Sequence, residues 1–233
     1  MNSRLPKQVV AEALGTALLL AAVVGSGIMG ERLANGNVAL ALLANSIATG
    51  AALVALILTF DGISGAHFNP AVTLAIAFQS SIPWPAVPFY LVAQIAGALL
   101  GVAGANLMFG LPVFFASHHV RAGGAQVFSE FVATFGLLSV VLGTGRRTRF
   151  APFAVAAYIA SAYWFTASTS FANPAVTLAR SLSDTFTGIR PLDVPGFIGA
   201  QLLGAALAVL LFGWLSPQLP RAAEPQTKQD ARS

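Results

Sequence analysis

One seven-residue string occurs twice in this chain, and it constrains the fold more than any other feature. Asn-Pro-Ala-Val-Thr-Leu-Ala stands at residues 69–75 and again, letter for letter, at 173–179, 104 positions later. Weaker echoes accompany it, because Ala-Glu at 11–12 resembles Ser-Glu at 129–130, and Ala-Gln at 93–94 recurs at 200–201. Self-similarity at a fixed spacing indicates an internal duplication. We therefore predict two related halves, residues 1–115 and 116–216, in a single domain spanning 1–216.

The composition is too apolar for a water-soluble domain. Of the 233 residues, 56% are hydrophobic and 9% are charged, whereas a soluble domain carries about 25% charged residues. A membrane-spanning helix needs about 20 apolar residues, and six such stretches are present, at 8–28, 38–60, 85–108, 127–145, 150–168 and 195–215. We predict an all-α membrane protein with six transmembrane helices, followed by a polar tail at 217–233.

The few chemically reactive residues argue against an enzyme. The chain has no cysteine, three histidines and only eight acidic residues. Disulfides and thiolate chemistry are excluded, and little remains for acid–base work. We expect no catalytic residues, no cofactor, no metal site and no nucleic-acid partner, since the net charge of +4 suits the orientation of a membrane protein.

Each copy of the repeated string follows a complete span but is too short to be another one. About ten apolar residues indicate a helix that enters the membrane and turns back. Three spans in each half force the second half to insert upside down relative to the first. Repeats of inverted topology place the functional site near the bilayer midplane, so the two short helices are expected to meet there.

The Asn-Pro pair at each string is a strong helix start. Asn is a preferred N-cap, and Pro at the first helical position loses no hydrogen bond. Two helix N-termini meeting at the midplane would repel cations through their partial positive charge and present the amides of Asn69 and Asn173. Irregular backbone at membrane depth is tolerated where it lines a water-filled cavity, so 62–68 and 168–172 would supply carbonyl acceptors. This chemistry suits a pore for small neutral polar molecules.

The distribution of Lys and Arg predicts the orientation in the bilayer. With six spans, one side receives eight of the twelve basic residues, at 4, 7, 146, 147, 149, 221, 228 and 232. The other side receives Arg32, Arg121, Arg180 and Arg190. Because basic residues gather on the cytoplasmic side, both termini are expected in the cytoplasm.

The stretch Ser-Gly-Ala-His-Phe-Asn-Pro-Ala-Val-Thr at 64–73 resembles the signature of the aquaporin and aquaglyceroporin family, the major intrinsic proteins, and the likeness covers nearly the whole chain. It implies a multi-pass protein of the cell inner (plasma) membrane, six spans with two half-helices, and a homotetramer with a pore in each subunit. It also implies that Glu12 and Glu130 brace the re-entrant loops. The implied pore residues are the two motifs, Asn69, Pro70, Ala71, Asn173, Pro174 and Ala175, with lining from Gly65, Ala66, His67, Phe68, Phe171 and Ala172.

The sequence departs from the family pattern at the position after the second Asn-Pro-Ala, where relatives resemble one another in having Arg and this chain has Val176. The other constriction positions follow by spacing from the motifs, at Thr49, Ser161 and Ser170. This filter has no aromatic ring and no charge, so we expect a wider opening than in a water channel and a more polar one than in a glycerol channel. Loss of the Arg also removes a charge that excludes ions.

Arg180 lies four residues beyond Val176 and hence on the same helix face, about 6 Å further along. It could place positive charge at the outer mouth of the pore. Alternatively it pairs with Asp184 or extends to the membrane interface. We favour the pairing or the interface.

The function that these observations predict is passive diffusion of small uncharged solutes, such as glycerol, urea and arsenous acid, together with water. A water-selective aquaporin is one alternative. A secondary active transporter is another, because inverted repeats with broken helices also build those; it would need an intramembrane proton relay, for which Asp61 and His67 are the candidates. A homologue with a closed pore is disfavoured by the four small filter residues.

Overall fold

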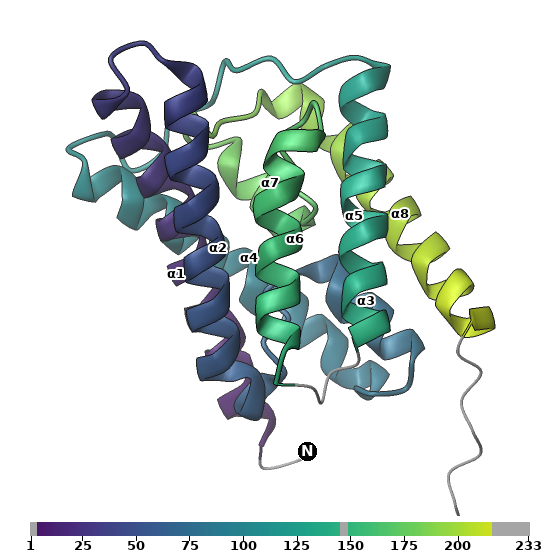
Figure 1. The fold of residues 1–233 in the computed structure, drawn as a ribbon. Coiled ribbons are helices and arrows are strands. Elements are labelled where there is room, and N and C mark those ends of the chain that lie inside the picture. The colour runs from purple at the N-terminus through teal and green to yellow at the C-terminus, as the bar shows by residue number, and fades with distance from the viewer. Residues whose placement is uncertain (1–3, 145–148, 216–233) are drawn as a thin grey trace, which may run out of the picture.

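The structure is a computed structural model that describes residues 4–144 and 149–215. Within these ranges the chain is helical and has no strand. Figure 1 shows the order of the elements along the bundle. The helices are α1 (Leu5–Leu33), α2 (Val38–Ser64), α3 (Pro70–Phe78), α4 (Val87–Met108), α5 (Gly124–Thr144), α6 (Ala151–Phe165), α7 (Pro174–Arg180) and α8 (Val194–Leu215), with single 3₁₀ turns at Trp84–Ala86 and Pro191–Asp193.

The long helices match the predicted spans closely. Five of them, α1, α2, α4, α5 and α8, are long and apolar enough to cross a membrane, and α6 is a sixth apolar helix of 15 residues. The span predicted at 150–168 is shorter than expected because Thr166 adopts an extended conformation that ends α6. The polar tail at 217–233, and Arg146 and Arg147, lie outside the described residues.

The long helices pack in related pairs, α1 against α4 in the first half and α5 against α8 in the second. Glycines allow these close approaches. A Cβ atom at Gly97 or Gly101 of α4 would lie 2.2 Å from a backbone oxygen of α1, and one at Gly204 of α8 would lie 2.5 Å from the Phe131 oxygen of α5. Small residues at such contacts are the usual means of packing helices in a membrane, where water drives no association.

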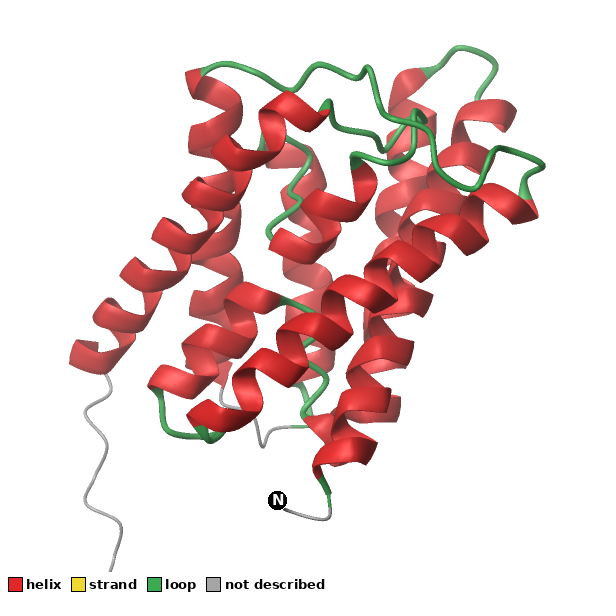
Figure 2. Ribbon diagram, turned by 180° about the vertical axis from the view of Figure 1, so that it is seen from behind, coloured by secondary structure: helices red, strands yellow, loops and turns green. Residues whose placement is uncertain are grey.

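The two short helices enter the bundle from opposite ends. Throughout, the lower end is the end where α1 begins in Figure 1, and the upper end is the one where α1 stops. Helix α3 lies in the lower half and α7 in the upper half, and their N-termini point toward one another in the middle of the bundle (Figure 2). Each starts as the sequence predicts, because Asn69 accepts a hydrogen bond from Ala71 N and Asn173 accepts from Ala175 N and Val176 N.

The loops that lead into α3 and α7 share an unusual backbone. Gly65, Ala66 and Phe68 have φ of 88°, 47° and 48°, and the residues 104 positions later, Thr169, Ser170 and Ala172, have 61°, 50° and 49°. Non-glycine residues in the left-handed region cost about 1–3 kcal/mol each and persist where surrounding structure holds them. The two halves therefore repeat the same strained backbone conformation even at positions where their amino acids differ.

Candidate pore

Glu12 holds the first re-entrant loop. It is fully buried in α1, and its Oε1 accepts from Ser64 Oγ at 2.6 Å and His67 N at 2.9 Å. Its Oε2 accepts from Phe68 N at 2.7 Å and from Gln94 Nε2 at 2.8 Å. A buried carboxylate needs such donors, and the strained loop needs acceptors for its N–H groups. The loop N–H groups supply the donors that the carboxylate needs, and the carboxylate supplies the acceptors that the loop needs.

Glu130 occupies the same place in the second half. Its carboxylate accepts from Phe171 N at 2.8 Å, Ala172 N at 2.9 Å and Gln201 Nε2 at 2.6 Å. Gln201 also donates to Thr177 Oγ1 at 2.8 Å, as Gln94 does to Thr73 Oγ1 at the same distance. The structure thus places both predicted bracing residues against the loops.

The two asparagines hold the opposite loops. Asn69 Nδ2 donates to Ala172 O, and Asn173 Nδ2 donates to Phe68 O, each at 2.8 Å. An amide nitrogen carries two hydrogens, and these bonds use one of each pair. The second hydrogen of each amide is available to a solute, since both side chains line the cavity described next.

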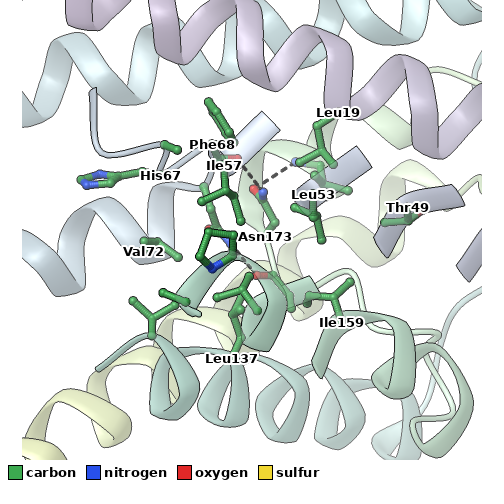
Figure 3. Close-up of a pocket in the computed structure, with 18 of the residues that line it drawn as sticks. Leu19, Thr49, Leu53, Ile57, His67, Phe68, Val72, Leu137, Ile159 and Asn173 are labelled. Atoms are coloured by element: carbon green, nitrogen blue, oxygen red, sulfur yellow. Dashed lines mark hydrogen bonds between the residues drawn. The ribbon is translucent and has the colours of Figure 1, made fainter. Parts of the chain in front are cut away.

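A cavity of about 520 Å³ passes between the helices and along both motifs. Figure 3 shows it around Asn173, with Leu53, Ile57, Leu137 and Ile159 on the walls. Most of the lining is apolar, and much of the polar lining comes from the two loops. Of the residues implied by the resemblance, those that line the cavity are Gly65, Ala66, His67, Phe68, Asn69, Phe171, Ala172 and Asn173; Pro70, Ala71, Pro174 and Ala175 are buried in the first turns of α3 and α7. Apolar walls with a few polar groups are typical of small-molecule sites.

Three of the four predicted filter residues line this cavity together, namely Thr49, Ser170 and Val176. Ser161 does not. It is exposed on the outer face of α6, and its Oγ donates to Tyr158 O at 2.7 Å. Tyr163 faces the cavity in its place, with its hydroxyl 3.2 Å from Thr49 Oγ1.

The difference at Ser161 has a geometric cause. Two residues along a helix rotate a side chain by about 200°, and α6 ends at Phe165, before the irregular segment 166–173. Counting back from Asn173 through irregular backbone does not preserve the helix face. An aromatic residue, Tyr163, therefore lines the cavity beside Thr49, whereas the filter predicted from the sequence has no aromatic ring.

The favoured interpretation of Arg180 is wrong. Asp184 pairs with His118 instead, through His118 N at 2.9 Å and Nδ1 at 3.0 Å. Arg180 is 2% exposed, so it does not extend to the membrane interface, and it lines the cavity. Its Nε donates to Thr187 O, and its guanidinium carbon stacks 3.4 Å from the centroid of the Phe171 ring.

A second buried arginine was missed by the sequence reasoning. Arg121 comes from the segment between α4 and α5 and donates to Gly188 O at 2.7 Å and Ser168 O at 3.1 Å. Its guanidinium carbon lies 5.0 Å from the Phe171 centroid. The only signal in the sequence was a single Arg inside a polar patch at 118–124, with no spacing to connect it to the pore.

The segment that carries Arg121 covers the C-terminal end of α7. Phe115 N donates to Leu182 O at 3.0 Å and Ser117 N to Ser181 O at 2.9 Å. Burial lowers the pKa of His119 there, and the charges of Arg121 and Arg180 lower it further. The hydrogen bonds from His118, its backbone N–H first, hold the pKa of Asp184 below its usual value of 3.8. The upper mouth is thus built from loop contacts and carries buried positive charge.

Helices of membrane-spanning length around a cavity lined by two re-entrant loops define a transmembrane channel. Residues 2–157 match the family model described as "Major intrinsic protein", and the chain belongs to that family, whose aquaporins and aquaglyceroporins are channels and not enzymes.

The similar proteins agree with this assignment. The chain is 54% identical over 227 residues to the aquaglyceroporin AqpS of Rhizobium meliloti (strain 1021), covering 96% of this chain and 97% of that protein. It is 36% identical over 150 residues to aquaporin NIP1-1 of Oryza sativa subsp. japonica, a match that spans 61% of this chain and half of that protein. The fold matches the X-ray structure of the aquaglyceroporin from Plasmodium falciparum with a TM-score of 0.69 at 17% identity, over 91% of this chain and 98% of that one.

Proposed function

We propose that this channel carries glycerol, urea and undissociated hydroxylated metalloids such as arsenous acid, together with water. The observation that carries the proposal is Val176, which lines the cavity beside Thr49 and Ser170 where relatives resemble one another in having an arginine. Thr49, Ser170 and Val176 are short, and although Tyr163 also lines the cavity beside Thr49, this level lacks the bulky arginine of relatives, which leaves room for solutes larger than water. The strong likeness to an aquaglyceroporin over almost the whole chain supports the same solute class.

The polar line of the cavity suits uncharged hydroxylated molecules. The amides of Asn69 and Asn173 offer donors, and the loop carbonyls offer acceptors, while most of the remaining lining is apolar. A polyol can exchange hydrogen bonds with both kinds of group and place its carbon atoms against the walls. The positive ends of α3 and α7 point at the same level, which disfavours cations.

The transporter alternative has little support from the cavity. The acidic and histidine residues that line the cavity are Asp61 and His67. Asp61 is exposed near the end of α2, and His67 Nδ1 lies 3.0 Å from Thr73 Oγ1. A proton relay needs a chain of such groups through the membrane. Two of them in the described lining do not form a chain.

The remaining features of the proposal concern placement and assembly. We propose that residues 1–216 form one channel domain of two inverted repeats in the inner membrane, with both termini in the cytoplasm. The lower end then faces the cytoplasm and the upper end the outside. Four copies would associate, each with its own pore, because the family resemblance implies a homotetramer.

The test is a light-scattering panel in proteoliposomes with glycerol, urea, arsenous acid and water as separate solutes. We expect glycerol and at least one of the other two solutes to equilibrate much faster than in empty vesicles, with no effect of an uncoupler. Water flux alone would favour the water-selective alternative. Accumulation of a solute against its gradient would overturn the channel in favour of a transporter.

A further inference from the structure

The two halves of the pore diverge at the first residue after the repeated string. Ile76 follows it in α3 and Arg180 follows it in α7. Both side chains are 2% exposed, and both line the cavity. The same place in the fold is thus apolar in the lower half and cationic in the upper half.

The guanidinium of Arg180 is only partly satisfied by the protein. It has five N–H donors, and the described residues provide Thr187 O for the Nε hydrogen and the face of Phe171 for the plane. At the upper end Asp184 pairs with His118 and Asp193 pairs with Arg190. The buried carboxylate of Glu130 attracts Arg180 at longer range, but its oxygen atoms accept from the loop and from Gln201. The Nη hydrogens are therefore available to whatever occupies the cavity.

A second donor faces the same space. Ser170 is 2% exposed and lines the cavity, and its Oγ has no hydrogen-bond partner among the described residues. A buried hydroxyl without a partner costs free energy. A solute oxygen atom or a water molecule in the cavity would satisfy it.

We propose that Arg180 is the selectivity-determining fixed charge of this pore and that, with Ser170, it docks the oxygen atoms of hydroxylated solutes at the upper end. This inference rests on the proposed function, because it assigns the residues that select the solutes. Arg180 lies one helical turn beyond Val176, about 6 Å along the axis. The pore then discriminates size at Val176 and charge at Arg180, on two separate levels.

The physical basis is a charge that bulk water and salt screen only weakly. Arg149 also lines the cavity, but it is exposed at the lower end, where salt and water weaken its field. Arg180 is enclosed, and Arg121, near the same Phe171 ring, adds a second positive charge. A unit charge about 10 Å from a passing cation opposes it by roughly a tenfold factor or more at the effective dielectric constant of a protein.

The experiment compares charge, size and position in reconstituted channels. Arg180→Gln keeps a planar donor group and removes the charge, Arg180→Lys keeps the charge and loses the planar fork, and Arg180→Ala removes both. Ile76→Ala is the matched control, because it enlarges the cavity at the corresponding place without changing its charge. Sodium conductance is measured in planar bilayers under an NaCl gradient, and glycerol flux is measured in proteoliposomes of the same preparations.

We expect the wild type, Arg180→Lys and Ile76→Ala to show no sodium current above the lipid background. Arg180→Gln and Arg180→Ala should show a sodium current about tenfold or more above that background. Glycerol flux should survive in Arg180→Gln and should fall severalfold when Ser170→Ala is combined with Arg180→Ala.

Sodium exclusion that is unchanged in an inserted Arg180→Gln protein would overturn the inference, and so would equal leakage in Arg180→Lys and Arg180→Gln. If Arg180→Ala fails to insert, the pair of Gln and Lys variants still decides. Absence of glycerol flux in the wild type would contradict the proposed function and the docking of solutes, whereas the sodium comparison would still test Arg180 as the fixed charge.

Discussion

The two re-entrant loops have almost the same backbone and different side chains. Three positions in each loop have left-handed φ angles that agree within 30° between the halves, and each loop is braced by a buried glutamate and glutamine. The side chains nevertheless differ, with His67 corresponding to Phe171, and Ile76 to Arg180. The comparison indicates that the repeated string and its braces fix the path of the pore, while the residues beside the string set its chemistry.

The supports of the two loops also differ. In the first half, Glu12 receives four donors, one of them the hydroxyl of Ser64. In the second half, Glu130 receives three, and Arg121 adds bonds to the carbonyls of Ser168 and Gly188. The loop that leads into α7 is therefore held partly by the side chain of Arg121, which comes from the segment between α4 and α5. The guanidinium of Arg121 also approaches the Phe171 ring beside the pore.

The largest effect is expected from replacing the braces. Glu12→Gln and Glu130→Gln each turn an acceptor oxygen into an NH₂ group that faces N–H donors, and each buried donor left without an acceptor costs about 1–3 kcal/mol. We expect both variants to lower the melting temperature in detergent and abolish most glycerol flux, with Glu12→Gln affected more because it receives more donors. Glu31→Gln, on the exposed part of α1, is the control. A Glu12→Gln protein as stable as this control would show that the loop does not depend on the brace.

Val176→Arg should have the next largest effect, on flux without loss of fold. It would place a bulky guanidinium, always charged, one turn from Arg180 and beside Thr49 and Tyr163. Urea and arsenous acid should lose most of their permeability and water the least, as measured by light scattering. Val176→Met separates bulk from charge. If Val176→Arg leaves every larger solute unchanged in an inserted protein, Val176 does not stand at the constriction.

Tyr163→Phe and Ser161→Ala test the corrected filter with a smaller effect. The first removes the hydroxyl near Thr49, and because a hydrogen bond contributes about 0.5–1.5 kcal/mol we expect glycerol flux to change by a few fold. The second alters an exposed residue on the outer face of α6 and should leave flux unchanged. The reverse order of effects would restore the filter predicted by spacing.

Most of the fold could be predicted because its signals are local. The apolar runs, the Asn-Pro helix starts and the repeated string each depend on neighbouring residues, and the positions of α1 to α8 follow from them. The residues of the two Asn-Pro-Ala motifs could be predicted because they are part of the repeated string. Thr49 could also be found by spacing, because the count back from Asn69 crosses only the short irregular stretch 65–68 before it enters the continuous helix α2. The count to Ser161 crosses the longer irregular segment 166–173.

The rest of the site depends on contacts between distant segments. Tyr163 reaches the cavity because of where α6 ends, and Arg121 reaches Phe171 from a loop fifty residues away in the chain. Arg180 was misassigned because Asp184, four residues on, suggested a helical pair, whereas α7 ends at Arg180 and Asp184 lies in the following turn. An i,i+4 argument fails where the helix does not continue.

The smallest effect is expected at the cover of α7, from acid. Asp184 accepts hydrogen bonds from His118 and Ser117, which hold its pKa below the ordinary 3.8. A carboxyl with a lowered pKa stabilises the folded state above its unfolded pKa, and this contribution is lost as the pH falls through the folded value. We therefore expect the protection of the amides at 115–119 against hydrogen exchange to stay constant above about pH 4 and to fall below it. Because exposed ion pairs contribute about 0–1 kcal/mol, the loss of protection should be only a few fold.

Asp184→Asn should show the faster exchange at every pH, whereas segment 65–69, which Glu12 holds inside the bundle, should keep its protection over the same range. Equal acceleration at 65–69 would mean that acid loosens both loops together, and the difference in their supports would not matter.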